Sequence, residues 1–313
     1  MAKNVLITGG TGLIGSRLTE LLLQGGHRVS LLSRKKEFIP DVTVYQWDIA
    51  KKTIELEAIE KADYIIHLAG AGVADGRWTD NRKREILESR TGSAGLLYES
   101  LKQTGHRPQA FISASAIGIY GADRGDELLS EESSYGNDFL ATVTKAWENS
   151  VQPIADLGIR TVKLRIGIVL SEKGGALAKL AAPIRLGAGT ALGSGRQWMS
   201  WIHIDDLCRM FMYALENESL TGAYNAVGPH PDTNTDLTRA AADALDRPLI
   251  LPNAPAFALK LLFGEMAVVV LGGVRVSNRK IAQAGFGYRF AGLPSAMADL
   301  LQQAPSPKGE QEK

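Results

Sequence analysis

A glycine-rich run follows the first apolar stretch of the sequence and extends from Thr8 to Gly15. Within it, Gly10-x-Gly12-x-x-Gly15 matches the dinucleotide fingerprint, and Gly9-x-x-Gly12-x-x-Gly15 matches its variant spacing. Such a loop lets a diphosphate approach main-chain N–H groups at a helix N-terminus, where a Cβ atom would block contact and the helix dipole favours an anion. The run therefore predicts a dinucleotide-binding loop, with a plain tight turn between strand and helix as the alternative.

A basic turn follows the second predicted strand, about 20 residues beyond these glycines. NAD-selective sites place an acidic residue here to hold the ribose 2′-hydroxyl, but this chain has Ser33 and Arg34 instead. A guanidinium makes paired, charge-assisted hydrogen bonds to phosphate oxygens, so the pair favours a 2′-phosphate. NADP(H) is therefore the predicted cofactor, and a solvated basic loop is the alternative.

Two further strand ends carry candidate ligand contacts. Asp48 ends the third predicted strand, where it could face an adenine, and Leu68-Ala69-Gly70 follows the fourth. Open α/β sheets bind ligands at the carboxyl ends of their strands. Ordinary turn chemistry, in which Asp and Gly are common, remains the alternative at both places.

The elements that must position these residues alternate between strands and helices over the first 170 residues. This alternation predicts a doubly wound parallel sheet of the Rossmann type, an α/β fold. The predicted dinucleotide-binding domain spans residues 1–170, completed by a later strand near 222–227; residues 171–303 mostly form a small C-terminal α/β cap, and 304–313 a flexible tail. The predicted strands are Asn4–Thr8, Arg28–Leu32, Val42–Trp47, Tyr64–Leu68, Ala110–Ala114 and Thr161–Leu170, and the main helices follow Leu13 and span Asn81–Lys102 and Asp138–Asp156.

Further motifs give the chain a clear resemblance to a known superfamily. They are Thr8–Gly15, Arg77-Trp78, Glu85, Ser89-Arg90, Ser113–Ala116, Asp138–Leu140, Trp147-Glu148, Gly193–Asp206, Asn225–Val227 and Gly264–Met266. The chain resembles the extended branch of the short-chain dehydrogenase/reductase superfamily. More narrowly, it is similar to the NAD-dependent epimerase/dehydratase-like group labelled "epimerase family protein", or cell-division inhibitor-like.

The resemblance implies a Rossmann sheet of strand order 3-2-1-4-5-6-7, an NADP cofactor and a cap. It adds several contacts to those drawn from the glycine loop. The residues predicted to contact the cofactor are Gly9, Thr11, Gly12, Leu13, Ile14, Gly15, Ser33, Arg34, Asp48, Leu68, Ala69, Gly70, Glu85, Arg90, Ser113 and Ile168.

The superfamily's proton relay is a serine at the end of the fifth strand with a Tyr-x-x-x-Lys pair on the next helix. Ser115 fits the serine, but Leu140 and Thr144 stand at the tyrosine and lysine positions. Tyr98-x-x-x-Lys102 matches the pattern on the wrong helix. Tyr120 is the predicted substitute beside Ser115, with one additional residue between them compared with the superfamily; a packed aromatic is the alternative.

The cap offers side chains for a second ligand. The predicted substrate contacts are Arg196, Trp198, Trp201 and Asp138, which provide a cation, aromatic walls and a carboxylate. Both tryptophans are equally compatible with a core position. His203 is expected to order a helix start, and Asp205 or Asp206 to cap that helix. Five scattered histidines and one cysteine predict no metal site.

Composition narrows the function class. The 35 basic and 34 acidic residues leave a formal charge of +1, which provides no field to attract nucleic acid or an anionic membrane. One cysteine and the absence of a leader or a long apolar segment lead us to expect a cytoplasmic protein. The sequence thus predicts an NADP(H)-binding oxidoreductase or epimerase-like protein acting on an unidentified small polar substrate; the alternative is a catalytically silent NADP(H)-binding regulator. A homodimer is left open.

Overall fold

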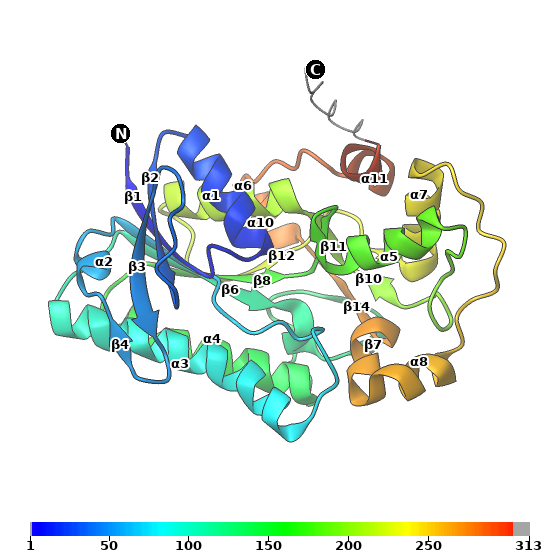
Figure 1. The fold of residues 1–313 in the computed structure, drawn as a ribbon, viewed down its shortest axis with the longest axis horizontal. Helices are drawn as coiled ribbons and strands as arrows, with labels where there is room; N and C mark the ends of the chain where they lie inside the picture. Colours follow the sequence, from blue (N-terminus) through cyan, green and yellow to red (C-terminus); the bar gives the residue numbers. More distant parts are fainter. Residues whose placement is uncertain (1, 303–313) are drawn as a thin grey trace, which may run out of the picture.

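A central eight-stranded sheet organises the protein in the computed structural model, which describes residues 2–302 (Figure 1). The strands lie in the order β12-β8-β6-β5-β1-β2-β3-β4, and only β4 pairs antiparallel. In chain order the seven parallel strands therefore read 3-2-1-4-5-6-7, which confirms the predicted Rossmann topology. Their bounds are β1 Asn4–Thr8, β2 Arg28–Ser33, β3 Val42–Asp48, β4 Thr53–Ile54, β5 Tyr64–His67, β6 Ala110–Ala116, β8 Thr161–Ile166 and β12 Gly222–Ala226.

Helices cover both faces of this sheet. On one face α1 (Leu13–Gln24) packs against α6 (Ile204–Glu216), and on the other α3 (Asp80–Thr104) packs against α4 (Phe139–Asp156) (Figure 1). The short helix α2 (Glu57–Glu60) precedes β5. The central strand β1 is buried on both faces, as expected for a parallel sheet between two helical layers.

The segment Thr161–Leu170, expected as one strand, is two. It breaks at Gly167, where a Cβ atom would lie 2.1 Å from the carbonyl oxygen of Ser200. Beyond this close approach, β9 (Ile168–Ser171) leaves the central sheet and pairs in parallel with β11 (Trp201–His203). The glycine thus lets the chain turn from the sheet toward the cap.

Short elements beyond the carboxyl ends of the parallel strands form the cap, which confirms that part of the predicted fold (Figure 1). Two elements from the second half of the chain, α6 and β12, belong instead to the central layers. The predicted tail 304–313 lies outside the described residues. The remaining elements are η1 Ile117–Tyr120, β7 Asp123–Leu129, α5 Gly175–Arg185, β10 Trp198–Met199, β13 Asp232–Thr233, α7 Asn234–Ala244, α8 Ala256–Phe263, η2 Gly264–Ala267, α9 Val268–Leu271, β14 Gly273–Val276, α10 Arg279–Gln283 and α11 Leu293–Leu301.

Across residues 2–302, none of the helices combines the length and the apolar character needed to span a membrane.

Candidate functional site

The glycine loop joins β1 to α1, and its glycines have different roles. Gly9 has φ +72°, and a Cβ atom there would lie 2.9 Å from the carbonyl carbon of Leu68. A Cβ atom on Gly15 would lie 2.3 Å from the oxygen of Gly9, so this glycine permits the close packing of helix and loop. A Cβ atom on Gly12 would lie 3.3 Å from that same oxygen, and no other protein atom beyond its chain neighbours would lie within 4 Å. Gly12 is thus the position where a side chain would obstruct a ligand rather than the protein.

The start of α1 is suited to an anion. Gly12 is its N-cap residue, and no side chain caps the helix. The first N–H groups of a helix have no partner within the helix, and they carry its positive dipole end. The loop therefore exposes main-chain donors where the sequence predicted a diphosphate.

A buried hydrogen-bond chain fixes the neighbouring strand end. Thr8 Oγ1 accepts the N–H groups of Leu68 and Ala69, both at 3.2 Å, so its own proton goes to His67 Nδ1 at 2.8 Å. The histidine is therefore the neutral Nε2–H tautomer, which faces Ser93 Oγ at 3.3 Å. This series of hydrogen bonds holds the residues at the end of β5 beside the glycine loop.

His67 should make stability depend on pH. Burial lowers its pKa to about 3, whereas an unfolded histidine titrates near 6.5. Below pH 6.5 the unfolded chain takes up a proton that the folded one does not, so the free energy of unfolding should fall by about 1.4 kcal/mol per pH unit toward pH 3. Urea unfolding across this range should show a steeper fall for the wild type than for His67→Gln. Equal slopes would contradict the buried neutral histidine.

The two candidate adenosine contacts differ in availability. Arg34 is exposed after β2 and makes no ion pair with any residue in 2–302, so its guanidinium is available to a ligand. Asp48 Oδ1 instead accepts the N–H of Lys51 at 3.0 Å, and this hydrogen bond lowers the pKa of the carboxyl group. Its carboxylate therefore serves a local turn, which was the alternative for this residue.

Three of the predicted cofactor contacts already have protein hydrogen-bond partners. Arg90 Nη1 donates to the carbonyls of Ala71 and Ile86, at 2.9 and 2.8 Å, and burial lowers the pKa of Arg90 to about 10. Glu85 is exposed and bonds Arg82 at 2.6 Å. Ser113 is buried and donates to the neighbouring carbonyl of residue 114. Arg90 therefore stabilises the loop after β5 through its hydrogen bond to the carbonyl of Ala71.

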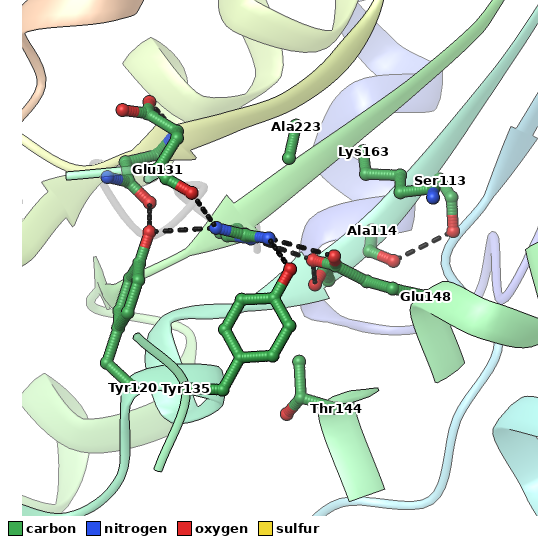
Figure 2. A network of polar contacts seen from close by, with 12 residues as sticks. Ser113, Ala114, Tyr120, Glu131, Tyr135, Thr144, Glu148, Lys163 and Ala223 are labelled. Carbon is green, nitrogen blue, oxygen red and sulfur yellow. Dashed lines mark hydrogen bonds and ion pairs between the residues drawn. The ribbon is translucent and has the colours of Figure 1, made fainter. Parts of the chain in front are cut away.

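Ser115 and Tyr120 belong to a buried polar network around the guanidinium of Arg165 on β8. Ser115 Oγ donates to Glu148 Oε1 at 2.6 Å, and Glu148 accepts two N–H groups of Arg165, at 2.8 and 3.0 Å. Tyr120 accepts from Arg165 at 3.0 Å and donates to Asn225 Oδ1 at 2.7 Å. Figure 2 shows Tyr120, Tyr135 and Glu148 converging on this guanidinium, with Tyr135 accepting at 3.2 Å.

This network gives both predicted catalytic residues protein partners. Ser115 and Tyr120 are almost fully buried, both hydroxyls have protein partners, and burial raises the pKa of Tyr120 despite the opposing effect of Arg165. Ser115 contacts Glu148, one helical turn beyond Thr144. Gly118 lies close to Leu140 and Thr144, because a Cβ atom there would lie 3.4 Å from Leu140 Cβ and 3.7 Å from Thr144 Oγ1.

The position expected for a proton relay therefore lacks the usual tyrosine and lysine. Gly118 has no side chain, and Leu140 offers no proton. Thr144 donates its hydroxyl to the carbonyl oxygen of Leu140 at 2.8 Å. Ser115 contacts the same helix at Glu148, four residues beyond Thr144.

The predicted substrate contacts also separate into two groups. Trp201 is fully buried, with Nε1 bonded to Asp232, and Asp138 accepts the N–H groups of Ala141 and Ala122 as the cap of α4. Both side chains have structural roles here, and for Trp201 the core position was the alternative. Arg196 is exposed, and Trp198 is half-buried with Nε1 bonded to Asp126.

His203 orders the start of α6, as expected. Its Nδ1 accepts the N–H of Asp205 at 3.1 Å, so the histidine is the N-cap in place of the predicted aspartates. Asp205 instead forms a two-pronged ion pair with Arg17 of α1, at 2.7 and 2.9 Å. Within residues 2–302, no group of three or more His, Cys, Asp or Glu side chains could hold a metal ion.

Sequence reasoning missed a cavity of about 470 Å³ between α1, the turn after β9, the start of α6 and α11. It borders the glycine loop at Thr11 and Gly12. The only signal in the sequence was the Gly174-Gly175 pair, which marked a turn but not what the turn covers. Its other lining residues are Leu13, Ser16, Arg17, Glu20, Ser171, Glu172, Lys173, Gly174, His203, Ile204, Asp205, Asp299 and Leu300.

Comparisons with known proteins agree with this architecture. The model of the NAD dependent epimerase/dehydratase family matches residues 5–227, and a domain of unknown function, DUF1731, matches residues 254–300. The epimerase family protein YfhF of Bacillus subtilis (strain 168) is 34% identical over 300 residues, which cover 95% of this chain and 98% of that protein.

Two solved structures are also similar over nearly the whole chain. The human epimerase family protein SDR39U1 (isoform 2), solved with NADPH, aligns with a TM-score of 0.86 and 30% identity over 96% of this chain and 100% of the other. A nucleoside-diphosphate sugar epimerase from Corynebacterium glutamicum aligns with a TM-score of 0.77 and 34% identity over 96% of this chain and 58% of that one. The resemblance inferred from the sequence motifs is confirmed, and the chain belongs to the NAD dependent epimerase/dehydratase family.

Proposed function

We propose that this protein binds NADP(H) at the carboxyl edge of its sheet and acts as an oxidoreductase or epimerase-like protein on a small polar substrate. The observation that carries the proposal is the uncapped start of α1 beside the open face of Gly12. A Cβ atom at Gly12 would fill the space in which a diphosphate must lie. The human relative solved with NADPH supports the same cofactor.

The residues of this site fit a phosphorylated dinucleotide. The N–H groups of Leu13 and Ile14 would hold the diphosphate, and Ser33 with the unpaired Arg34 would bind the 2′-phosphate. Leu68 and Ala69, fixed through Thr8, would support the cofactor from the neighbouring strand. A bound nicotinamide supplies or accepts a hydride, and the protein's part is to position it and to limit access of water.

Proton transfer is the step for which this chain has the fewest suitable side chains. Gly118, Leu140 and Thr144 offer no side chain that could exchange a proton with a carbonyl or alcohol at that position. This observation favours a second candidate, a catalytically silent protein that holds NADP(H) as a ligand or structural group. We keep the oxidoreductase first because Arg196 and Trp198 remain at the surface of the cap, where a second ligand could contact them.

Turnover separates the two candidates. Bound NADPH, followed by its fluorescence, should be oxidised by at least one member of a panel of small polar aldehydes and ketones. Mass spectrometry of molecules that copurify with the protein would identify the cofactor and any second ligand. Tight retention of NADP(H) with no oxidation by any compound would favour the silent protein. We also propose a cytoplasmic location, in keeping with a chain whose one cysteine, Cys208, is buried and forms no disulfide.

Arg34 should determine the choice between cofactors. Arg34→Asp removes a charge-assisted pair with the 2′-phosphate and adds repulsion, so NADPH binding should weaken by about 2 kcal/mol or more. NADH lacks that phosphate, and its affinity should change little. Calorimetric titration of both nucleotides into the wild type and the variant measures this difference. An equal loss for both would refute the assignment of the 2′-phosphate to Arg34.

A further inference from the structure

Arg275 lies on β14 without a polar partner. Within residues 2–302 its guanidinium makes no hydrogen bond and no ion pair, and its Nε atom is buried without an acceptor. The other arginines in that range that are at least partly buried all donate side-chain hydrogen bonds to protein atoms; they are Arg17, Arg82, Arg90, Arg124, Arg160 and Arg165. Buried donors without an acceptor are rare, because they lose their hydrogen bonds to water on folding. Hydrogen bonding within the protein therefore does not explain the position of Arg275.

The guanidinium of Arg275 lies over the indole ring of Trp198. Its Cζ atom is 4.9 Å from the ring centroid. Trp198 Nε1 donates to Asp126 Oδ1 at 2.8 Å, and the main chain of Trp198 pairs with Thr233 in β13, so the ring is held from two sides. An aromatic face attracts a cation without using its N–H donors. Trp198 therefore orients Arg275 and leaves those donors available.

The outer edge of this guanidinium is open to a ligand. Nη1 and Nη2 have no hydrogen-bond partner among residues 2–302, and unlike Nε they are accessible. Together they form a planar fork whose spacing matches two oxygens of a carboxylate or a phosphate. The fork can therefore bind an oxyanion end-on, although Nε is covered by protein.

The nearest acidic side chains along the chain pairing do not neutralise Arg275. The strand beside it, β7, carries three exposed carboxylates, and none of them forms an ion pair with Arg275. Each has a partner of its own: Asp123 accepts a main-chain N–H of its turn, Asp126 holds the Trp198 ring, and Glu127 pairs with an arginine of the same strand. The positive charge of Arg275 is thus left for a ligand.

Arg275 also lies at the edge of the sheet where a second ligand would bind. Its strand packs beside η1, which directly follows β6. Ser200 Oγ donates to the carbonyl of residue 274 at 2.7 Å and accepts the N–H of residue 276 at 2.9 Å, while its main-chain oxygen accepts the N–H of Ile168, just after β8. Figure 1 shows β7, β10 and β14 together beyond the carboxyl ends of the parallel strands. Open α/β sheets bind their ligands at this edge.

We propose that Arg275, supported by Trp198, binds an anionic group of the second ligand, so that the small polar substrate carries a carboxylate or a phosphate. This inference rests on the proposed function, because it names the chemical class of the substrate of that protein. Two parallel hydrogen bonds from one guanidinium fix the direction of the bound group as well as its charge. Arg275 thus positions the substrate, whereas the glycine loop and Arg34 hold the cofactor.

The test compares how far two anions raise the melting temperature, Tm, of variants of the full-length chain. Sodium phosphate and sodium acetate, each at about 50 mM, are compared with sodium chloride of equal ionic strength, so the two arms separate a phosphate site from a carboxylate site. An anion bound with a dissociation constant of about 10 mM should raise Tm by about 2 °C. The wild type should show this additional rise with at least one anion, and Arg275→Gln should lose it. Arg275→Lys keeps the charge without the planar fork and should retain less than half of the rise.

The matched control is Arg247→Gln, at an exposed position after α7, which should respond to both anions as the wild type does. Only the difference between the wild type and Arg275→Gln counts, because phosphate bound at the glycine loop or beside Arg34 raises the Tm of both alike. Equal rises in these two proteins with both anions would overturn the proposal.

Nucleotide binding separates this proposal from the proposed function. The dissociation constant of NADPH should be the same for Arg275→Gln as for the wild type, and a weaker NADPH complex would overturn the assignment of Arg275 to the substrate. If the wild type binds neither NADPH nor NADH, the proposed function fails, whereas the anion comparison still decides whether Arg275 binds an oxyanion.

Discussion

Gly12→Val should abolish dinucleotide binding while leaving the protein folded. The Cβ atom of the valine would lie 3.3 Å from the Gly9 carbonyl oxygen, its nearest protein atom beyond its chain neighbours. The φ of −78° at Gly12 is one that residues other than glycine adopt readily. The branched side chain would instead project into the space for the diphosphate. We expect affinity for NADPH to fall at least a hundredfold, or about 2.8 kcal/mol. Calorimetric titration and far-UV circular dichroism together measure binding and folding.

Gly15→Ala is the matched comparison on the same loop. A Cβ atom there would lie 2.3 Å from the carbonyl oxygen of Gly9 and 2.6 Å from Gly10 Cα, so the loop itself must move. This variant should lose thermal stability as well as nucleotide affinity, whereas Gly12→Val, with its 3.3 Å contact, should lose much less stability than Gly15→Ala. Wild-type affinity in folded Gly12→Val would mean that the diphosphate does not lie on this loop.

Glu148→Ala should cause the largest loss of stability. It leaves the Arg165 guanidinium, which is 2% exposed, without its carboxylate, and it deprives Ser115 of its hydrogen-bond acceptor. Burial alone would lower the pKa of Arg165, but Glu148 outweighs burial and raises it, so the ion pair dominates this environment. Removing one partner of a buried pair costs about 3–5 kcal/mol, and urea unfolding should show a loss of that size.

Two controls separate the ion pair from the helix. Asn149→Ala, exposed on the same helix, should change the free energy of unfolding by less than about 0.5 kcal/mol. The double variant Glu148→Met with Arg165→Met removes both charges and should be more stable than Glu148→Ala, because no unpaired charge remains. A loss below about 1 kcal/mol for Glu148→Ala would show that the network contributes little to folding.

The central fold followed from local sequence signals. The glycine run, the apolar strands and the helix after Leu13 each carry their own periodicity or turn chemistry, and all seven parallel strands begin at the predicted residue or close to it. The difference lies in where the segment that begins at Thr161 ends, because it was expected as one strand to Leu170. Its division at Gly167 depends on the approach of Ser200, a contact between distant parts of the chain that no local pattern reports.

The roles of polar residues were harder to predict, because they depend on which partner each side chain reaches. Ser115 lay at the expected strand end, yet its hydroxyl reaches Glu148, and Gly118 lies next to Leu140 and Thr144. Trp201 is a residue type that often lines ligand pockets, but here it lies wholly in the core. The sequence identified the candidate side chains, and the three-dimensional contacts decided which of them remain free.

The central claim is that the uncapped start of α1 binds a dinucleotide. Isothermal titration calorimetry of the wild-type protein with NADPH tests this claim most directly. We expect heat of binding with one nucleotide per chain and weaker binding of NADH. No heat with either nucleotide, at protein concentrations that would detect a dissociation constant of about 100 μM, would contradict the claim.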